Sequence, residues 1–118
     1  MSQSPRRVCQ IVRLKKETFD EYKRIHDEIW PEVLEAIKTV NIGDYSIFLD
    51  DRDYTLIGVF KYFGNDFDGD MAKFRENAAM QKWWKITDGM QDTLVKDSTG
   101  STDEKGWWAN LPEIFRLE

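Results

Sequence analysis

The sequence predicts an α+β fold from three observations. Short stretches of alternating apolar and polar residues, typical of half-buried strands, are separated by stretches with the three- and four-residue spacing of amphipathic helices. The order of these segments is strand, helix, strand, strand, helix, strand. The chain has 118 residues, 41% hydrophobic and 33% charged, the balance of a globular protein large enough for one core. We therefore expect a single domain over residues 1–118, built around an antiparallel sheet.

A strand and a helix are predicted near the N-terminus. Apolar side chains alternate along residues 8–14, which favours a strand that is apolar on much of both faces. Thr18 is placed to cap a helix over about residues 19–29, and Glu21, three residues later, completes a capping box.

A proline and a hairpin organise the middle of the chain. Pro31 disfavours the helical conformation in the residue before it, and it begins a second helical segment over residues 31–40. Residues 45–49 and 54–63 alternate as two further strands. The short acidic turn at residues 50–53 joins these strands as an antiparallel hairpin, and it is better explained as a solvated turn than as a metal site.

The last half of the chain predicts a helical region, a loop and a closing strand. Residues 67–95 have helical spacing of apolar and aromatic side chains, and residues 114–117 predict a strand. Residues 96–106 are polar and rich in turn formers, and we expect them, like residues 1–6, to be flexible. The resulting β-α-β-β-α-β order is the ferredoxin-like plan, with both helices on one face of an antiparallel sheet.

The strand at residues 54–63 also predicts the oligomeric state. Both of its faces carry large apolar side chains: one has Tyr54, Leu56, Phe60 and Tyr62, and the other has Ile57, Val59 and Phe63. The helices of a ferredoxin-like subunit cover only one sheet face, so the other would lie in water. We therefore expect a homodimer in which two sheets face each other.

Composition excludes several classes of protein. The chain has 17 basic and 22 acidic residues, a net charge of −5, so a nucleic-acid partner is not expected. Cys9 is the only cysteine and His26 the only histidine, which argues against a disulfide or a zinc site. The acidic stretch at residues 66–70 departs from a calcium loop because its glycine is at the fourth position, and a helix-starting turn explains it better.

No other cofactor or targeting motif is present in the sequence. It contains no glycine-rich phosphate loop and no serine nucleophile elbow, so we expect no cofactor and no metal. The N-terminal residues are not followed by the apolar stretch of a secretory signal, and no run is long enough to span a membrane. We expect a cytoplasmic protein with no membrane partner.

The helix at residues 19–29 carries the first candidate site. Histidine exchanges protons near neutral pH, and helical spacing places Tyr22 and Trp30 on the same face as His26. The same spacing, through Phe19 and Ile29, also fits the buried stripe of an ordinary amphipathic helix. The pattern by itself leaves His26 either an acid–base group or a core residue.

The pair Trp83-Trp84 is the second candidate site. Adjacent helix positions point about 100° apart, so one indole can pack inward while the other lines a cleft. Indole faces and N–H groups suit the C–H faces and hydroxyls of a sugar, although they also suit a core.

Four sequence segments together resemble the L-rhamnose mutarotase family. They contain Glu21-Tyr22, His26 and Ile29-Trp30-Pro31-Glu32, then Asp44-Tyr45, Ile47 and Leu49-Asp50, then Trp83-Trp84-Lys85, then Glu113-Ile114-Phe115. The resemblance covers nearly the whole chain. It implies a dimeric α+β barrel of ferredoxin-like subunits that interconverts the α and β anomers of L-rhamnose. It also implies that His26 is the proton donor and that Tyr22, Tyr45, Trp83 and Trp84 bind the sugar.

Mutarotation suits so sparse a set of groups. One proton must reach the ring oxygen and one must leave the anomeric hydroxyl, so a histidine assisted by a tyrosine or a water suffices without metal, redox cofactor or covalent intermediate. The substrate is a free monosaccharide, L-rhamnose or a close 6-deoxy relative.

The chain departs from the family pattern at two places. Asp27-Glu28 stands where bacterial members often have Asn-Pro, and the segment at residues 96–108 is longer, with an additional Trp107-Trp108 pair. The first affects the pKa of His26 and the second affects which sugar fits. Two alternatives stay open on the same dimeric barrel: a non-catalytic small-molecule binding module, and a cofactor-free oxygenase acting on a planar aromatic ligand.

Overall fold

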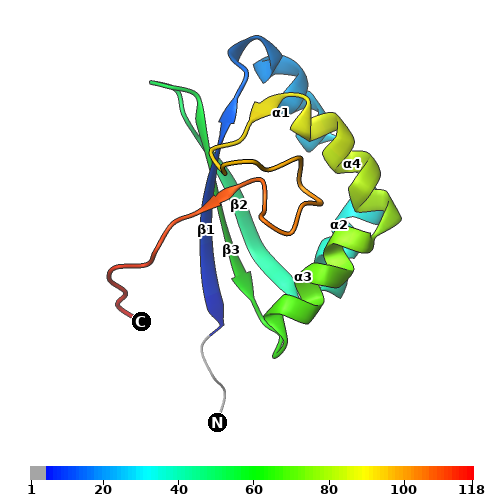
Figure 1. Ribbon diagram of the computed structural model, residues 1–118, viewed down its shortest axis with the longest axis vertical. Helices are drawn as coiled ribbons and strands as arrows, with labels where there is room; N and C mark the ends of the chain where they lie inside the picture. The colour runs from blue at the N-terminus through cyan, green and yellow to red at the C-terminus, as the bar shows by residue number, and fades with distance from the viewer. Residues whose placement is uncertain (1–4) are drawn as a thin grey trace.

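A computed structural model describes residues 5–118 and has two layers, a curled antiparallel sheet and a layer of helices (Figure 1). The strand order is β2-β3-β1-β4, and β5 also pairs with β1. The strands are β1 (Arg6–Leu14), β2 (Ile42–Asp50), β3 (Thr55–Tyr62), β4 (Gln91–Asp92) and β5 (Ala109–Asn110). The helices are α1 (Phe19–Asp27), α2 (Pro31–Thr39), α3 (Phe67–Glu76) and α4 (Ala78–Asp88), after the short 3-10 turn η1 (Lys16–Thr18). All four α-helices lie on one side of the sheet.

Local sequence determines several of the element boundaries. Pro31 is the first residue of α2, and Trp30 before it is extended, as the proline requires. Asn41 adopts a left-handed conformation, with φ of 66°, that turns the chain from α2 into β2. The Asp66 carboxylate accepts a hydrogen bond from the Gly69 N–H at the start of α3, which confirms the predicted helix-starting turn.

The apolar core lies between the sheet and the helices. Alternate residues of β1 and β3 face it, and the fully enclosed members include Val12 from β1 and Val33 from α2. The predicted division of β3 is confirmed, because Leu56, Phe60 and Tyr62 are buried.

The opposite face of the sheet carries exposed apolar side chains. Phe48 of β2 and Phe63, just after β3, are each 59% exposed, and Val59 of β3 is 38% exposed. Among residues 5–118, Figure 1 shows only the C-terminal segment crossing beside this face of the strands.

Three predicted features differ from the structure. Residues 114–117 form no strand; the last strand pairing occurs at β4 and β5, and residues 111–118 extend from the sheet with Ile114 94% exposed. The continuous helical region over residues 67–95 is two helices and a strand, because Asn77 leaves the helical conformation and its side chain caps α4.

The capping box at Thr18 is also wrong. Thr18 donates its hydroxyl to the carbonyl of Lys15 within the 3-10 turn, and Glu21 pairs instead with Arg24 one turn along α1. The predicted flexibility of residues 1–4 lies outside the described residues.

Candidate active site

Helix α1 carries the two polar side chains at the centre of the candidate site. Tyr22 and His26 lie one helical turn apart, and their rings stack with centroids 4.3 Å apart. The Trp83 indole of α4 meets the His26 ring edge-on at 5.1 Å, and Trp30 packs against Trp83 at 5.3 Å. The predicted alignment therefore occurs for Tyr22 and His26, whereas Trp30 lies beyond the end of α1 in an extended conformation and packs on Trp83 instead.

A cavity of about 400 Å³ lies between these helices and the sheet. All five site residues predicted from the sequence line it: His26, Tyr22, Tyr45, Trp83 and Trp84. They come from α1, β2 and α4, which are distant in the chain. Trp83 is 5% exposed and Trp84 is half-buried, so both tryptophans contribute to the wall while Trp83 also belongs to the core.

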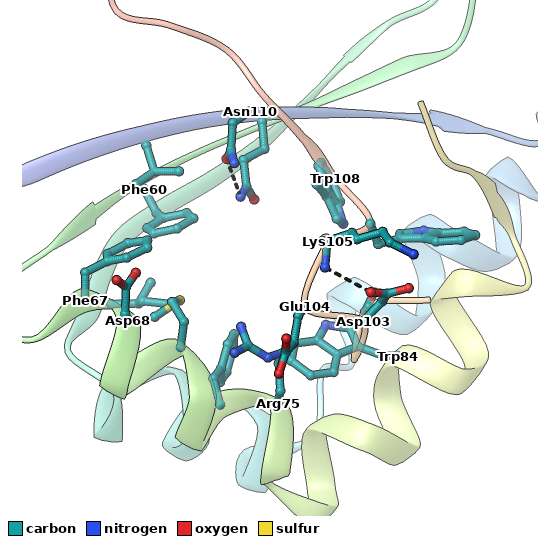
Figure 2. A pocket seen from close by; sticks show the side chains of 18 of the residues that line it. Phe60, Phe67, Asp68, Arg75, Trp84, Asp103, Glu104, Lys105, Trp108 and Asn110 are labelled. Atoms are coloured by element: carbon teal, nitrogen blue, oxygen red, sulfur yellow. Dashed lines mark hydrogen bonds between the residues drawn. The ribbon is translucent and has the colours of Figure 1, made fainter. Parts of the chain in front are cut away.

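A second hollow of about 510 Å³ adjoins the first, and Tyr45, Phe74, Trp84 and Trp108 line both. Figure 2 shows this hollow with Phe60 and Asn110 from the sheet on one side and Trp84 from α4 on the other. Charged side chains of the loop before β5 form a third side, among them Asp103, Glu104 and Lys105. The combined space has aromatic walls interrupted by hydrogen-bonding groups, a lining typical of a small-molecule site.

The hydrogen bond of His26 determines which ring nitrogen is free. Its Nδ1 lies 2.7 Å from the backbone carbonyl oxygen of Tyr22. A carbonyl oxygen only accepts, so Nδ1 carries the hydrogen, and Nε2 of the neutral ring is left with a lone pair. Burial lowers the pKa of His26 below its ordinary value, while the Tyr22 carbonyl and Asp27 oppose this shift. The ring is therefore mainly neutral at pH 7, and Nε2 is its proton-exchanging atom.

The two tyrosines of the site stay protonated at neutral pH. Burial raises the pKa of Tyr22 well above its usual value, and the nearby Tyr45 adds to this shift. Burial also raises the pKa of Tyr45 to about 12, although this side chain faces the cavity and is 37% exposed. Both phenols are therefore hydrogen-bond donors rather than phenolates, next to a histidine that accepts.

The segment from β4 to β5 supplies the wall that the sequence patterns left unassigned. Trp108 packs against β3 at Gly58, where a Cβ atom would lie only 3.2 Å from the indole, so glycine makes room for it. The Asp88 carboxylate at the end of α4 accepts hydrogen bonds from the backbone N–H and hydroxyl of Ser101. These contacts attach the segment to the helices and the sheet.

Sequence reasoning identified the Trp107-Trp108 pair but missed Gln91. This residue is 3% exposed and lies in β4 beside the cavity, with hydrogen bonds to Tyr22 and Trp107. No local signal distinguishes it, because an isolated glutamine in a polar stretch has no pattern. Its partners are 69 positions before it and 16 positions after it in the chain.

Comparisons with known proteins show which family the chain belongs to. A family model described as L-rhamnose mutarotase matches residues 7–117. An L-rhamnose mutarotase of Listeria monocytogenes is 42% identical over 111 residues, 94% of this chain and 97% of that protein. One of Burkholderia cenocepacia is 37% identical over 99 residues, 84% of this chain and 86% of that protein. The crystal structure of an L-rhamnose mutarotase from Formosa agariphila, 26% identical, has a TM-score of 0.73 and covers 96% of this chain and 99% of that one.

These findings define first a class: the protein is an isomerase that acts on carbohydrates. More narrowly, the chain belongs to the L-rhamnose mutarotase family, as the sequence resemblance predicted. Membership in this family supports interconversion of the anomers of L-rhamnose, and it favours neither the binding-module nor the oxygenase alternative. The part of the chain that the structure describes contains no helix long and apolar enough to cross a membrane.

Proposed function

We propose that the protein interconverts the α and β anomers of L-rhamnose, or of a closely related 6-deoxy sugar, without a cofactor. His26 is the acid–base group: it accepts a proton in ring opening and is the proton donor in ring closure. The observation that carries this proposal is the convergence of His26 and Tyr22 with Tyr45, Trp83 and Trp84 on one cavity. The tryptophan faces suit the C–H groups of a pyranose, and the phenols donate to its hydroxyls.

The proposed reaction begins at the free nitrogen of His26. Nε2 takes the proton of the anomeric hydroxyl while the C1–O5 bond breaks and O5 receives a proton from a second donor, a tyrosine or a water. The aldehyde then rotates about the C1–C2 bond and presents its other face to O5. On closure the imidazolium donates its proton to the carbonyl oxygen, and the O5 proton returns to the second donor. No electrons are transferred, and the only net change is the configuration at C1.

The lowered pKa of His26 suits both halves of this cycle. A ring that is neutral at pH 7 is ready to accept, and the imidazolium formed during the reaction is a stronger acid than an unperturbed one. Asp27 opposes this lowering of the pKa only in part, since its carboxylate forms an ion pair with Lys23, and the Glu28 carboxylate forms one with Arg24.

The proposal includes a ferredoxin-like subunit that forms a homodimer, a dimeric α+β barrel. The strand order β2-β3-β1-β4 supports the ferredoxin-like plan of the subunit. The exposed apolar side chains of Phe48, Val59 and Phe63 on the open sheet face support the homodimer. Residues 111–118 add to this argument, since Ile114 and Phe115 are 94% and 81% exposed on a segment that leaves the subunit (Figure 1). Burying such area contributes about 25 cal/mol for each Å².

Saturation-transfer NMR of anomeric protons tests the activity. The purified protein is added to a panel of free sugars, L-rhamnose, L-fucose, L-mannose and D-glucose, before and after treatment with EDTA. We expect accelerated exchange for L-rhamnose, a weaker effect on sugars of different stereochemistry, and no loss of rate after EDTA. The proposal fails if no free pyranose exchanges faster than in buffer alone. Exchange that disappears with EDTA and returns with a metal would overturn the cofactor-free mechanism.

A further inference from the structure

A chain of hydrogen bonds connects the segment before β5 to the Tyr22 hydroxyl. The Trp107 Nε1–H donates to Oε1 of Gln91 at 2.9 Å, and Nε2 of Gln91 donates to the Tyr22 hydroxyl oxygen at 3.0 Å. Gln91 and Tyr22 are 3% and 6% exposed, so water does not compete for these bonds. Three side chains from α1, β4 and the loop before β5 are thus held in one arrangement.

The direction of each bond in this chain follows from the chemistry of its members. An indole N–H only donates, so the Gln91 carbonyl oxygen must face Trp107, and the Gln91 amide group must face Tyr22. The Tyr22 oxygen is therefore an acceptor, and its own hydrogen points elsewhere. Within residues 5–118 the Tyr22 hydroxyl makes no hydrogen bond other than the one from Gln91, and Tyr22, His26 and Gln91 all line the cavity.

We propose that Gln91 and Trp107 are positioning residues that hold the Tyr22 hydroxyl with its hydrogen toward the cavity, which makes Tyr22 the second donor of the anomer exchange. This inference rests on the proposed function. Tyr22 gives its proton to O5 as the C1–O5 bond breaks, while Nε2 of His26 takes the proton of the anomeric hydroxyl. Both protons return on closure. The Tyr22 and His26 rings stack with centroids 4.3 Å apart and line the same cavity, so the donor and the acceptor act on one bound sugar, whose O1 and O5 are bonded to the same carbon.

Gln91→Glu separates this role from a structural one. The change is nearly isosteric, but a carboxylate only accepts, so it takes hydrogen bonds from both Trp107 and Tyr22 and turns the Tyr22 hydrogen away from the cavity. When the introduced carboxyl group is protonated, its O–H donates to Tyr22 as the amide does. We therefore expect the exchange rate relative to wild type to fall at least tenfold as the pH rises through the pKa of that group. A purely structural role predicts a ratio that does not change with pH.

NMR of protein labelled with ¹³Cζ-tyrosine reports the Tyr22 hydroxyl without relying on activity. Tyr22→Phe identifies the signal by its disappearance, and Gln81→Glu, at an exposed position of α4, is the matched control. In the wild type, L-rhamnose should shift the Tyr22 signal. In Gln91→Glu at high pH, the Tyr22 chemical shift should differ from that of the sugar-free wild type even without sugar, and adding L-rhamnose should not change it further.

Each outcome of these measurements has a defined meaning. If the wild type exchanges anomers normally and the Tyr22 chemical shift in Gln91→Glu is the same as in the wild type, only the role of Gln91 is overturned, and the proposed function stands. Absence of exchange by the wild type overturns the proposed function and, with it, the role of Tyr22 as second donor. If Gln91→Glu does not fold, Trp107→Phe decides, because losing the indole N–H frees the Gln91 amide to rotate. We expect this variant to lose at least threefold in rate and to shift the Tyr22 signal, and an unmoved signal with full rate would overturn the proposal.

Discussion

Replacing His26 by glutamine tests the proposed proton transfer most directly. Glutamine keeps an N–H group that can donate to the Tyr22 carbonyl, as Nδ1 does at 2.7 Å, but its amide does not exchange protons near neutral pH. The variant loses the ring contacts with Tyr22 and Trp83, each worth about 0.5–1.5 kcal/mol in aromatic pairs. We therefore expect a loss of about 1–3 kcal/mol in the free energy of unfolding, which leaves a folded protein.

The expected effect on the reaction is larger than the effect on stability. A positioned acid–base group contributes about 10²–10⁴-fold, so anomer exchange should fall by at least about 10²-fold in His26→Gln. Sugar binding should persist, because Tyr45, Trp83 and Trp84 still line the cavity.

The assay compares exchange rates by saturation-transfer NMR with the binding of L-rhamnose by calorimetry. Arg24→Gln is the matched control, since it places the same residue on the exposed side of α1, where Arg24 forms ion pairs with Glu21 and Glu28. The control should exchange anomers at the wild-type rate. A folded His26→Gln protein that binds sugar and exchanges anomers within twofold of wild type would refute the acid–base role of His26.

Three further predictions concern pH, the cavity wall and the dimer. Because burial lowers the pKa of folded His26, the unfolded chain binds more protons than the folded protein below about pH 6.5, and chemical denaturation should show that the free energy of unfolding decreases as the pH falls through that value. The rate of anomer exchange should decline at the lower pKa of His26 in the folded protein. The His26→Gln variant should lack this pH-dependent part of the stability. Gly58→Val should displace the Trp108 indole, raise the KM for L-rhamnose and cost about 1–3 kcal/mol of unfolding free energy, whereas unchanged kinetics would show that Trp108 does not contribute to the sugar site. Light scattering should give a mass near twice the 14.0 kDa of the chain, and Phe48→Glu should reduce it toward one chain; a wild-type monomer at micromolar concentration would contradict the dimer.

The sequence determined the elements whose signals are local. The alternation in β1 and β3, the proline at the start of α2 and the turn at Asp66 depend on near neighbours in the chain, so their structures follow from short-range sterics and hydrogen bonding. The sequence also predicts the part of the candidate site that lies on one helix, because helical spacing alone brings Tyr22 beside His26. The Trp83-Trp84 pair is visible in the sequence, but its sugar-binding role, like the whole assignment of Tyr45, depends on the family resemblance.

Only the tertiary structure decided the features that depend on distant partners. The two-residue strands β4 and β5 exist because β1 offers free hydrogen-bonding groups at its edge, and so short a pairing leaves no periodic pattern in the sequence. The expected strand at residues 114–117 has the right composition but meets no partner strand in the subunit. Gln91 illustrates the same limit at the site, since an amide acquires a donor toward Tyr22 and an acceptor toward Trp107 only when three separate segments are packed together.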